Sequence, residues 1–337
     1  MKLRVHRRVR QLLVVVGALI VLGVGLLLVS SRLSLDADYA HTRGAEALPP
    51  LSTGISQGLV QIRARGLSFR ARVAGLDREG PALLLLHGFP ETSIMWQPLM
   101  EVAARAGLRV VAFDQRGYSP LARPTDVEAY RLPELVADVF AVADAVGFER
   151  FHLVGHDWGA IVGWAAAGQD HVRVRSYVSL SIPHPGAIRV ANEGQGAPAY
   201  VRFFRMPGIP ETLFTSGGLA PMRTAMYAAM PSDQVDEYVS VFSEPGALRA
   251  ALNWYRAMPS EFLSGPDLAG EVVQPVLSVF GTRDLQVFTR AEVRQHQPRF
   301  VTGPYTPIEL DSGHWLIQER PAEVVDAVMR HLAALDP

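Results

Sequence analysis

Residues 151–168, "FHLVGHDWGAIVGWAAAG", decide the fold. Their first six residues are typical of a strand, and the stretch from Trp158 is typical of a helix. Between them Asp157 occupies the centre of G-x-D-x-G, a sharp strand-to-helix turn that presents a nucleophile, in the position where serine is usual. Gly155 and Gly159 flank it because this turn leaves no room for side chains. The turn lifts the Asp157 side chain clear of the sheet and directs the backbone N–H of Trp158 toward the position of an oxyanion.

The segments around this turn alternate between strands and helices. Apolar runs and apolar–polar alternation predict strands at 59–66, 67–75, 82–88, 108–114, 151–156, 174–182, 275–281 and 306–311. Periodic apolar spacing predicts helices at 93–107, 131–147, 158–168 and 321–335. The first two strands are expected to form an antiparallel pair. The remaining rhythm predicts an α/β fold with a mostly parallel central sheet and helices on both faces.

One segment interrupts that rhythm. Residues 186–262 are rich in Met, Pro, Tyr and Phe and carry no strand signal, so we expect an inserted helical segment there. We therefore predict one domain over residues 58–337, with this insertion between two of its strands.

The composition of the chain excludes several classes of function. The chain has 337 residues, 49% hydrophobic, with a formal net charge of −1, so no basic surface is available for nucleic acid. It has no cysteine, which excludes thiol nucleophiles and disulfides. Lys2 is the only lysine, and the sequence contains neither HExxH nor a Gly-rich dinucleotide motif. We expect no metal and no cofactor.

Chemically useful residues follow four of the predicted strands. The loops are "HGFPE" (87–91), "GHDWGA" (155–160), "GTRD" (281–284) and "DSGHW" (311–315). Active sites of open α/β sheets gather at these strand ends. The order along the chain is Asp157, Asp284, His314, which is the order of nucleophile, acid and base in triads of this fold. In such a triad Asp284 orients His314 and keeps it basic.

Together these motifs resemble the epoxide hydrolase family of the α/β-hydrolase superfamily. The resemblance extends over the whole predicted domain, through "HGFPE", "GHDWGA", "SIPHP" (181–185) and "SGHW". Two matches fall in the insertion: "NWYR" (253–256) and, more loosely, "AYVRFFRMPGIPE" (199–211). The resemblance implies that the insertion is a helical cap and that Tyr200 and Tyr255 are a pair of catalytic tyrosines. It also implies an oxyanion hole made by the N–H groups of Phe89 and Trp158.

The implied reaction is the hydrolysis of a small hydrophobic epoxide to a vicinal diol. A carboxylate is ionised at neutral pH without help from a base, and it attacks carbon directly to form a hydrolysable ester. Asp157 is expected to open the ring while Tyr200 and Tyr255 hydrogen-bond the leaving oxygen. His314, paired with Asp284, then activates the water that hydrolyses the ester. Two alternatives stay open: a haloalkane or haloacid dehalogenase with the same triad, and a non-catalytic membrane-tethered protein that retains the fold.

The N-terminus has a different character. Residues 1–10 are strongly basic, and residues 12–29 contain no polar side chain; as a helix this run would be ~27 Å long, close to the thickness of a bilayer core. We predict a membrane anchor over residues 1–31 and a linker over residues 32–57. The flanking charges predict a cytoplasmic N-terminus with the catalytic domain across the membrane. The alternatives are a cleaved signal peptide, which would give a secreted protein, and a helix buried in the soluble fold.

Overall fold

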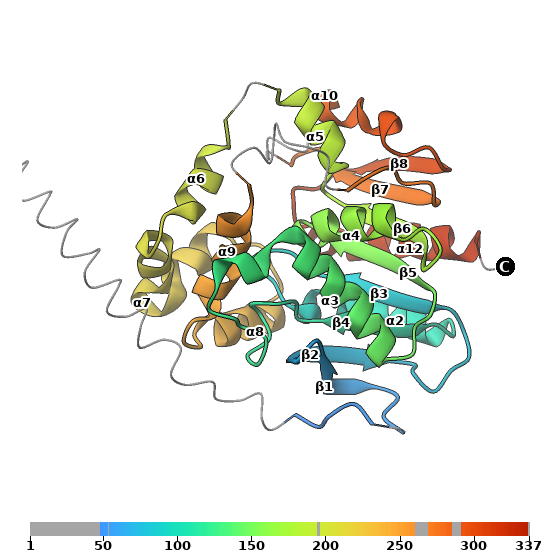
Figure 1. Ribbon diagram of the computed structural model, residues 1–337, viewed down its shortest axis with the longest axis horizontal. Helices are drawn as coiled ribbons and strands as arrows, with labels where there is room; N and C mark the ends of the chain where they lie inside the picture. The colour runs from blue at the N-terminus through green and yellow to red at the C-terminus, as the bar shows by residue number, and fades with distance from the viewer. Residues whose placement is uncertain (1–47, 53, 194–195, 260–268, 285–290, 336–337) are drawn as a thin grey trace, which may run out of the picture.

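The computed structural model describes residues 48–52, 54–193, 196–259, 269–284 and 291–335. Within these residues eight strands form one sheet in the order β1-β2-β4-β3-β5-β6-β7-β8 (Figure 1). The strands are β1 (Gly58–Ala64), β2 (Leu67–Ala74), β3 (Ala82–Leu86), β4 (Arg109–Phe113), β5 (Phe151–His156), β6 (Val174–Leu180), β7 (Val276–Gly281) and β8 (Tyr305–Leu310). The predicted α/β fold with a mostly parallel sheet is confirmed.

Strand direction brings the motif loops to one edge. β1 and β2 form an antiparallel hairpin, and β2 pairs antiparallel with β4. All the other pairs, from β4 through β3 to β8, are parallel. The carboxyl ends of β3 to β8 therefore lie at the same edge of the sheet, and the loops that follow β3, β5, β7 and β8 converge there.

The centre of the sheet is buried on both faces. The five residues of β3 alternate between two cores, Leu84 and Leu86 facing one and Leu83 and Leu85 facing the other. Helices α3 (Leu132–Ala145) and α4 (Trp158–Gln169) cover the first face, and α2 (Gln97–Arg105) and α12 (Pro321–Ala333) cover the second (Figure 1). This double cover explains why β3 is apolar at every position.

One predicted helix is divided. The periodic run at 93–107 forms a short 3₁₀ turn, η2 (Ser93–Trp96), followed by α2. Pro98 lies in the first turn of α2, where its missing N–H costs no helical hydrogen bond, so the helix starts anew at that point.

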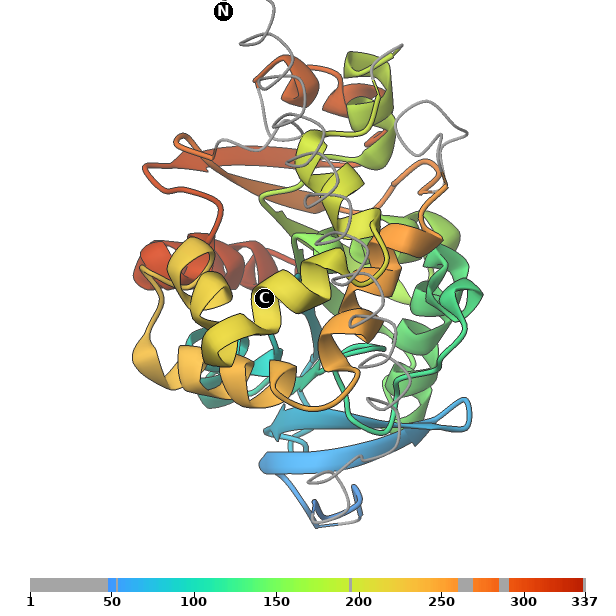
Figure 2. The same ribbon diagram turned by 90° about the vertical axis from the view of Figure 1, so that its left-hand side faces the viewer.

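The described part of the chain between β6 and β7 carries five helices. It contains α5 (Pro185–Ala191), α6 (Ala199–Arg205), α7 (Ile209–Ala225), α8 (Ser232–Phe242) and α9 (Ala247–Ala257). Figure 2 shows α6 to α9 lying in front of the sheet, across the edge where its parallel strands end. We call α6 to α9 the cap. Residues 260–262, the end of the predicted insertion, lie outside the described residues.

Shorter elements complete the described chain. They are η3 (Val127–Tyr130), α10 (Ala291–Arg294), η5 (Gln297–Arg299) and α11 (Leu316–Glu319).

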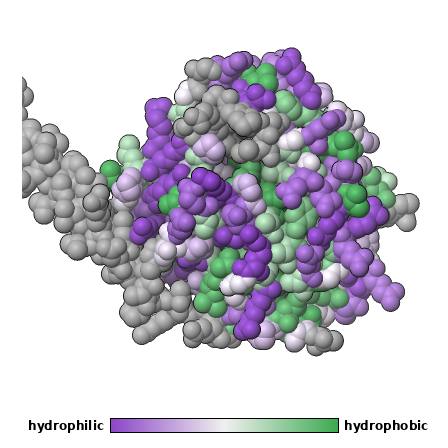
Figure 3. Space-filling view, in the orientation of Figure 1, coloured by the Kyte–Doolittle hydropathy of each residue, from purple (hydrophilic) through white to green (hydrophobic). Residues whose placement is uncertain are grey.

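Hydrophilic and hydrophobic side chains are interspersed on the face shown in Figure 3. In the part of the chain that the structure describes, no helix is both long and apolar enough to cross a bilayer. The predicted anchor at residues 12–29 lies outside that part.

Candidate active site

Asp157 occupies a strained turn between β5 and α4. Its backbone has φ +51° and ψ −120°, a conformation that side-chain-bearing residues rarely adopt and that costs on the order of 1–3 kcal/mol. Gly159 packs against β3 so closely that a Cβ there would lie 2.2 Å from the carbonyl oxygen of Leu86. A Cβ on Gly155 would lie 2.3 Å from the carbonyl oxygen of Gly159. The two glycines therefore permit the turn, and the turn projects Asp157 from the edge of the sheet.

The Asp157 carboxylate is buried and held at both oxygens. Oδ1 accepts a hydrogen bond of 2.8 Å from the backbone N–H of Phe89, and Oδ2 lies 3.5 Å from Nε2 of His314. The residue is only 8% exposed, and this burial alone would raise the pKa of the carboxyl group. The interactions with His314 and the Phe89 N–H outweigh burial and lower the pKa below its ordinary value. Asp157 is therefore ionised at neutral pH.

His314 lies between two carboxylates. Its Nδ1–H donates to Oδ2 of Asp284 at 2.9 Å, and the side chain of Asp284 is fully buried. Burial favours the neutral imidazole, but the interactions of His314 with Asp157 and Asp284 raise its pKa to about 10. The resting site thus contains an imidazolium between two carboxylates. The structure brings the three residues together from the ends of β5, β7 and β8.

Tyr255 faces the turn from α9. Its ring makes edge-on contacts with three aromatic rings, with centroid distances of 4.9 Å to Phe204, 5.1 Å to Trp158 and 5.5 Å to Phe89. Two of these rings belong to the residues whose N–H groups are predicted to form the oxyanion hole. Tyr255 is only 6% exposed and therefore has a fixed position over that part of the site.

Tyr200 approaches from α6 and is half-buried. Its ring packs edge-on against Phe204, with 5.8 Å between centroids. Burial and then the negative charge of Asp157 raise the pKa of Tyr200 and of Tyr255. Both phenols are therefore neutral hydrogen-bond donors in the field of the same carboxylate.

The two predicted oxyanion donors, the N–H groups of Phe89 and Trp158, differ in whether they already have a hydrogen-bond partner. The Phe89 N–H already donates to Oδ1 of Asp157, and Gly88 permits this approach, since a Cβ there would lie 2.4 Å from that of Asp157. Trp158 is the first residue of α4, directly after Asp157, so its N–H is one of the free donors at a helix N-terminus. A donor already bound to a carboxylate oxygen is placed to stabilise negative charge on that same oxygen later.

Behind His314 lies a buried group that the sequence analysis did not assign. The ring of His156 contacts Oε2 of Glu91 through Nδ1 at 2.7 Å and the backbone carbonyl oxygen of His314 through Nε2 at 3.0 Å. Ser181 donates to the same carbonyl oxygen at 2.9 Å, and Gln318 donates to Oε1 of Glu91. Because a carbonyl only accepts, Nε2 of His156 carries a proton. These contacts fix the backbone of His314. The only sequence signal was that Glu91 ends "HGFPE" and His156 precedes Asp157.

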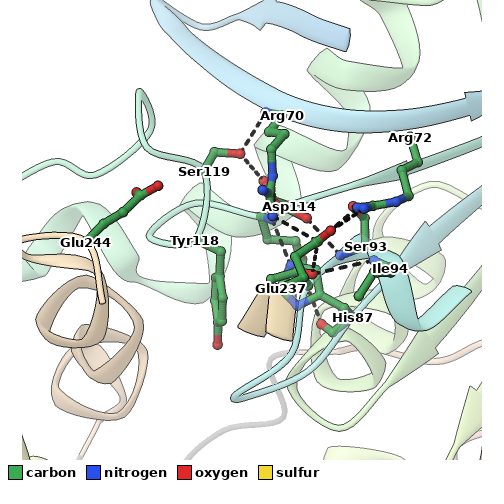
Figure 4. A network of polar contacts seen from close by, with 12 residues as sticks. Arg70, Arg72, His87, Ser93, Ile94, Asp114, Tyr118, Ser119, Glu237 and Glu244 are labelled. Carbon is green, nitrogen blue, oxygen red and sulfur yellow. Dashed lines mark hydrogen bonds and ion pairs between the residues drawn. The ribbon is translucent and has the colours of Figure 1, made fainter. Parts of the chain in front are cut away.

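A charged junction fixes the cap on the loop that carries Phe89. Glu237 of α8 accepts from Arg70 at 3.1 Å and Arg72 at 3.0 Å, both on β2, and from the Thr92 hydroxyl at 2.6 Å. Arg70 also contacts Asp114, and Oδ1 of Asp114 accepts from the backbone N–H of Ser93, the residue after Thr92. Figure 4 shows Glu237 directed toward these groups, with Glu244 on the far side of Tyr118. The cap thus contacts the core through ion pairs as well as through aromatic packing.

Known proteins resemble this chain over most of its length. The family model described as alpha/beta hydrolase fold matches residues 81–212. Epoxide hydrolase A of Mycobacterium tuberculosis is 32% identical, over 82% of this chain and 97% of that protein. Epoxide hydrolase 3 of Xenopus tropicalis is 30% identical, over 85% and 80%. The crystal structure of epoxide hydrolase A from Mycobacterium thermoresistibile superimposes with a TM-score of 0.68 at 29% identity, over 82% and 98%.

The fold and these relatives define an α/β hydrolase. Within that superfamily the chain belongs to the epoxide hydrolase family.

Proposed function

We propose that this protein hydrolyses an epoxide to a vicinal diol through a covalent ester on Asp157. The observation that carries the proposal is an ionised, buried carboxylate with one oxygen on a backbone N–H and the other facing His314, under two neutral phenols. An epoxide presents strained sp³ carbons, so it requires in-line displacement and a donor for the leaving oxygen. A carboxylate and two phenols supply both.

Ring opening uses Oδ2, the carboxylate oxygen that does not accept from the Phe89 N–H. Oδ2 of Asp157 attacks a ring carbon, the C–O bond of the ring breaks, and the leaving oxygen receives hydrogen bonds from Tyr200 and Tyr255. Oδ1 stays on the Phe89 N–H and becomes the carbonyl oxygen of the ester. The raised pKa of both phenols supports their role as neutral donors.

Ester formation also prepares His314 for its step. Part of the rise in its pKa comes from the negative charge of Asp157, 3.5 Å from Nε2, and this charge is lost when the carboxylate becomes a neutral ester. The imidazolium therefore gives up its proton more readily after ring opening, and that proton passes by way of a tyrosine to the leaving oxygen, which becomes the first hydroxyl of the diol. Neutral His314, oriented by Asp284, then takes a proton from the water that attacks Cγ of Asp157.

The tetrahedral intermediate carries its negative charge on Oδ1. The N–H groups of Phe89 and Trp158 stabilise that charge, each by about 3 kcal/mol in comparable sites. As the intermediate collapses, the bond from Cγ to the diol oxygen breaks and His314 returns its proton to that oxygen. The diol leaves, and the proton of the new carboxyl group passes to His314. This restores the imidazolium and an Asp157 carboxylate that now contains one oxygen from water.

Oxygen isotopes test this route. In a single turnover in oxygen-18 water, both diol oxygens should be unlabelled, because one comes from the epoxide and the other from Asp157. The peptide that contains Asp157 should gain one label. Label in the first-turnover diol would mean that water attacks the epoxide directly.

We further propose that residues 12–29 anchor the enzyme in a membrane with the N-terminus in the cytoplasm. The support is the uninterrupted apolar run and the basic flank formed by Lys2, Arg4, Arg7, Arg8 and Arg10. Protease added to intact spheroplasts of an expressing bacterium should digest the catalytic domain and spare a small membrane-bound piece. Full protection of the domain would exclude this topology, whereas a soluble form that begins near residue 32 would indicate signal-peptide cleavage.

A further inference from the structure

The two helices that carry the tyrosines are joined by an arginine at the end of α6. Arg205 donates through Nε to the carbonyl oxygen of Tyr255 at 2.9 Å, and through Nη2 to those of Met258 at 2.9 Å and Pro259 at 3.0 Å. In a regular helix the carbonyl of Tyr255 would accept from the N–H four residues later, but residue 259 is proline and has none. Arg205 donates the hydrogen bond that the proline cannot, and so caps the C-terminal end of α9.

A second arginine makes the reverse connection. Arg256 of α9 donates through Nη2 to the carbonyl oxygen of Met206, the residue that follows α6, at 3.0 Å. The same nitrogen lies 2.7 Å from Glu211 of α7, and Nη1 donates to Asn253 at 3.2 Å. Each of the two helices thus has the end of its backbone satisfied by an arginine of the other. We call Arg205 and Arg256 the crossed arginines.

The crossed arginines lie next to the residues that face the substrate. Arg256 follows Tyr255 directly, and Arg205 follows Phe204, whose ring packs against both Tyr255 and Tyr200. A sliding movement of α6 along α9 would change the separation of the two phenols, and it would also break all of the contacts that Arg205 makes to α9. The contacts therefore fix the relative position of the two helices.

We propose that Arg205 and Arg256 are positioning residues that hold Tyr200 and Tyr255 at the separation at which both phenols reach one leaving oxygen. This inference rests on the proposed function, since it gives the tyrosines their task. Arg205 is the cleaner residue to test. In the described part of the chain no carboxylate pairs with it, whereas loss of Arg256 would leave Glu211 buried beside no cation.

The test compares Arg205→Met, Arg205→Lys and Arg202→Met in the full-length chain. Arg202 lies on the same helix, and among the described residues its side chain donates to Ala197, outside α9, so it is the matched control. Each change is combined with His314→Gln, which stops the reaction at the ester, and mass spectrometry then follows ester formation with styrene oxide. We expect Arg205→Met to slow ester formation about 10- to 100-fold, because an error of 1 Å in a reacting group has an effect of this size. Arg205→Lys should be intermediate, and Arg202→Met should match the parent.

Two further measurements separate positioning from a general loss of structure. With His314 intact, hydrolysis of the ester should be unchanged in Arg205→Met, because the tyrosines act only in ring opening. In a Tyr200→Phe background, Arg205→Met should cause little additional loss, because the paired donors are already broken. Equal slowing of both steps, or fully additive losses, would overturn the inference. If Arg205→Met fails to fold, the same two measurements on Arg205→Lys decide.

Failure of the proposed function would look different. If Tyr200→Phe and Tyr255→Phe form the ester at the parent rate, the tyrosines have no role in ring opening, whatever Arg205→Met does. If both tyrosine changes slow ester formation and Arg205→Met does not, only the inference about the crossed arginines is wrong.

Discussion

The core side of the candidate site and its cap side are held in place by different forces. Asp157, Asp284 and His314 stand on turns at the ends of β5, β7 and β8, and the parallel sheet fixes the positions of those turns. Tyr200 and Tyr255 stand on helices that reach their places through aromatic packing and charged contacts. The position of Asp157 therefore depends on backbone geometry, whereas the positions of Tyr200 and Tyr255 depend on long side chains that single substitutions can release.

Turnover should be more sensitive to a substitution on the core side, at Asp157, than to one on the cap side. Asp157→Asn keeps the shape of the turn but replaces an ionised oxygen with a weakly nucleophilic amide. We expect turnover to fall by on the order of 10⁴-fold or more, as loss of a nucleophile does in comparable enzymes. The measurement is diol formation from an epoxide panel, with the substitution verified by mass spectrometry after the assay. Near-normal turnover by the verified Asp157→Asn variant would exclude covalent catalysis by this residue.

The same variant has a consequence for the pKa of His314. Burial lowers that pKa, but Asp157 and Asp284 together raise it to about 10, so in the parent the imidazolium persists through the neutral range. The asparagine removes the charge of Asp157, and His314 should therefore lose its proton at a lower pH. A histidine titration by NMR measures the change. An unchanged pKa would mean that Asp284 alone sets it.

Loss of the base should separate the two chemical steps. His314→Gln leaves Asp157 able to attack but provides no group to activate water. We expect turnover to fall by on the order of 10³-fold or more while the ester accumulates. Intact-protein mass spectrometry should find one substrate mass added per chain. Absence of the adduct, with the fold retained, would show that His314 acts in ring opening or not at all.

The cap side should show smaller effects that are confined to one step. Tyr255→Phe removes a hydroxyl and keeps the ring contacts, so folding should change little. Ring opening should slow about 10- to 1000-fold, which is typical of the loss of one transition-state donor. Stopped-flow or rapid-quench kinetics of ester formation measures this rate. Any turnover of a haloalkane should be unaffected, because a halide leaves without a proton; equal losses on both substrates would indicate a structural role.

The same contrast explains what could be predicted from the sequence. The turn at Asp157 is specified by Gly155 and Gly159, which lie within two residues of it. The burial of β3 is indicated by its own apolar run. Local sequence patterns therefore predicted both features. The contact between Glu91 and His156 joins residues 65 apart, and that between Arg205 and Tyr255 joins residues 50 apart. No periodicity encodes such pairs, because they exist only once elements that are far apart in the sequence have packed against each other.

Glu237 offers the mildest test of how the cap is held on the core. It accepts from Arg70, Arg72 and Thr92, and the last of these lies three residues after Phe89, the proposed oxyanion donor. Glu237→Gln removes the charge and keeps the size, so we expect a loss of about 1–2 kcal/mol in the free energy of unfolding, as for other charge-assisted hydrogen bonds.

Glu244→Gln is the matched control for this change. Glu244 also forms a cap-to-core pair, with Arg123 at 2.6 Å, but Arg123 donates to Gly117 and Tyr118 and not to the loop of Phe89. Thermal melts should therefore show similar losses for the two variants. Only Glu237→Gln should slow ester hydrolysis, by a few-fold, because the oxyanion donor loses part of its support. If both variants hydrolyse the ester equally well, the junction at Glu237 holds the cap without setting the position of Phe89, and the core side is independent of the cap.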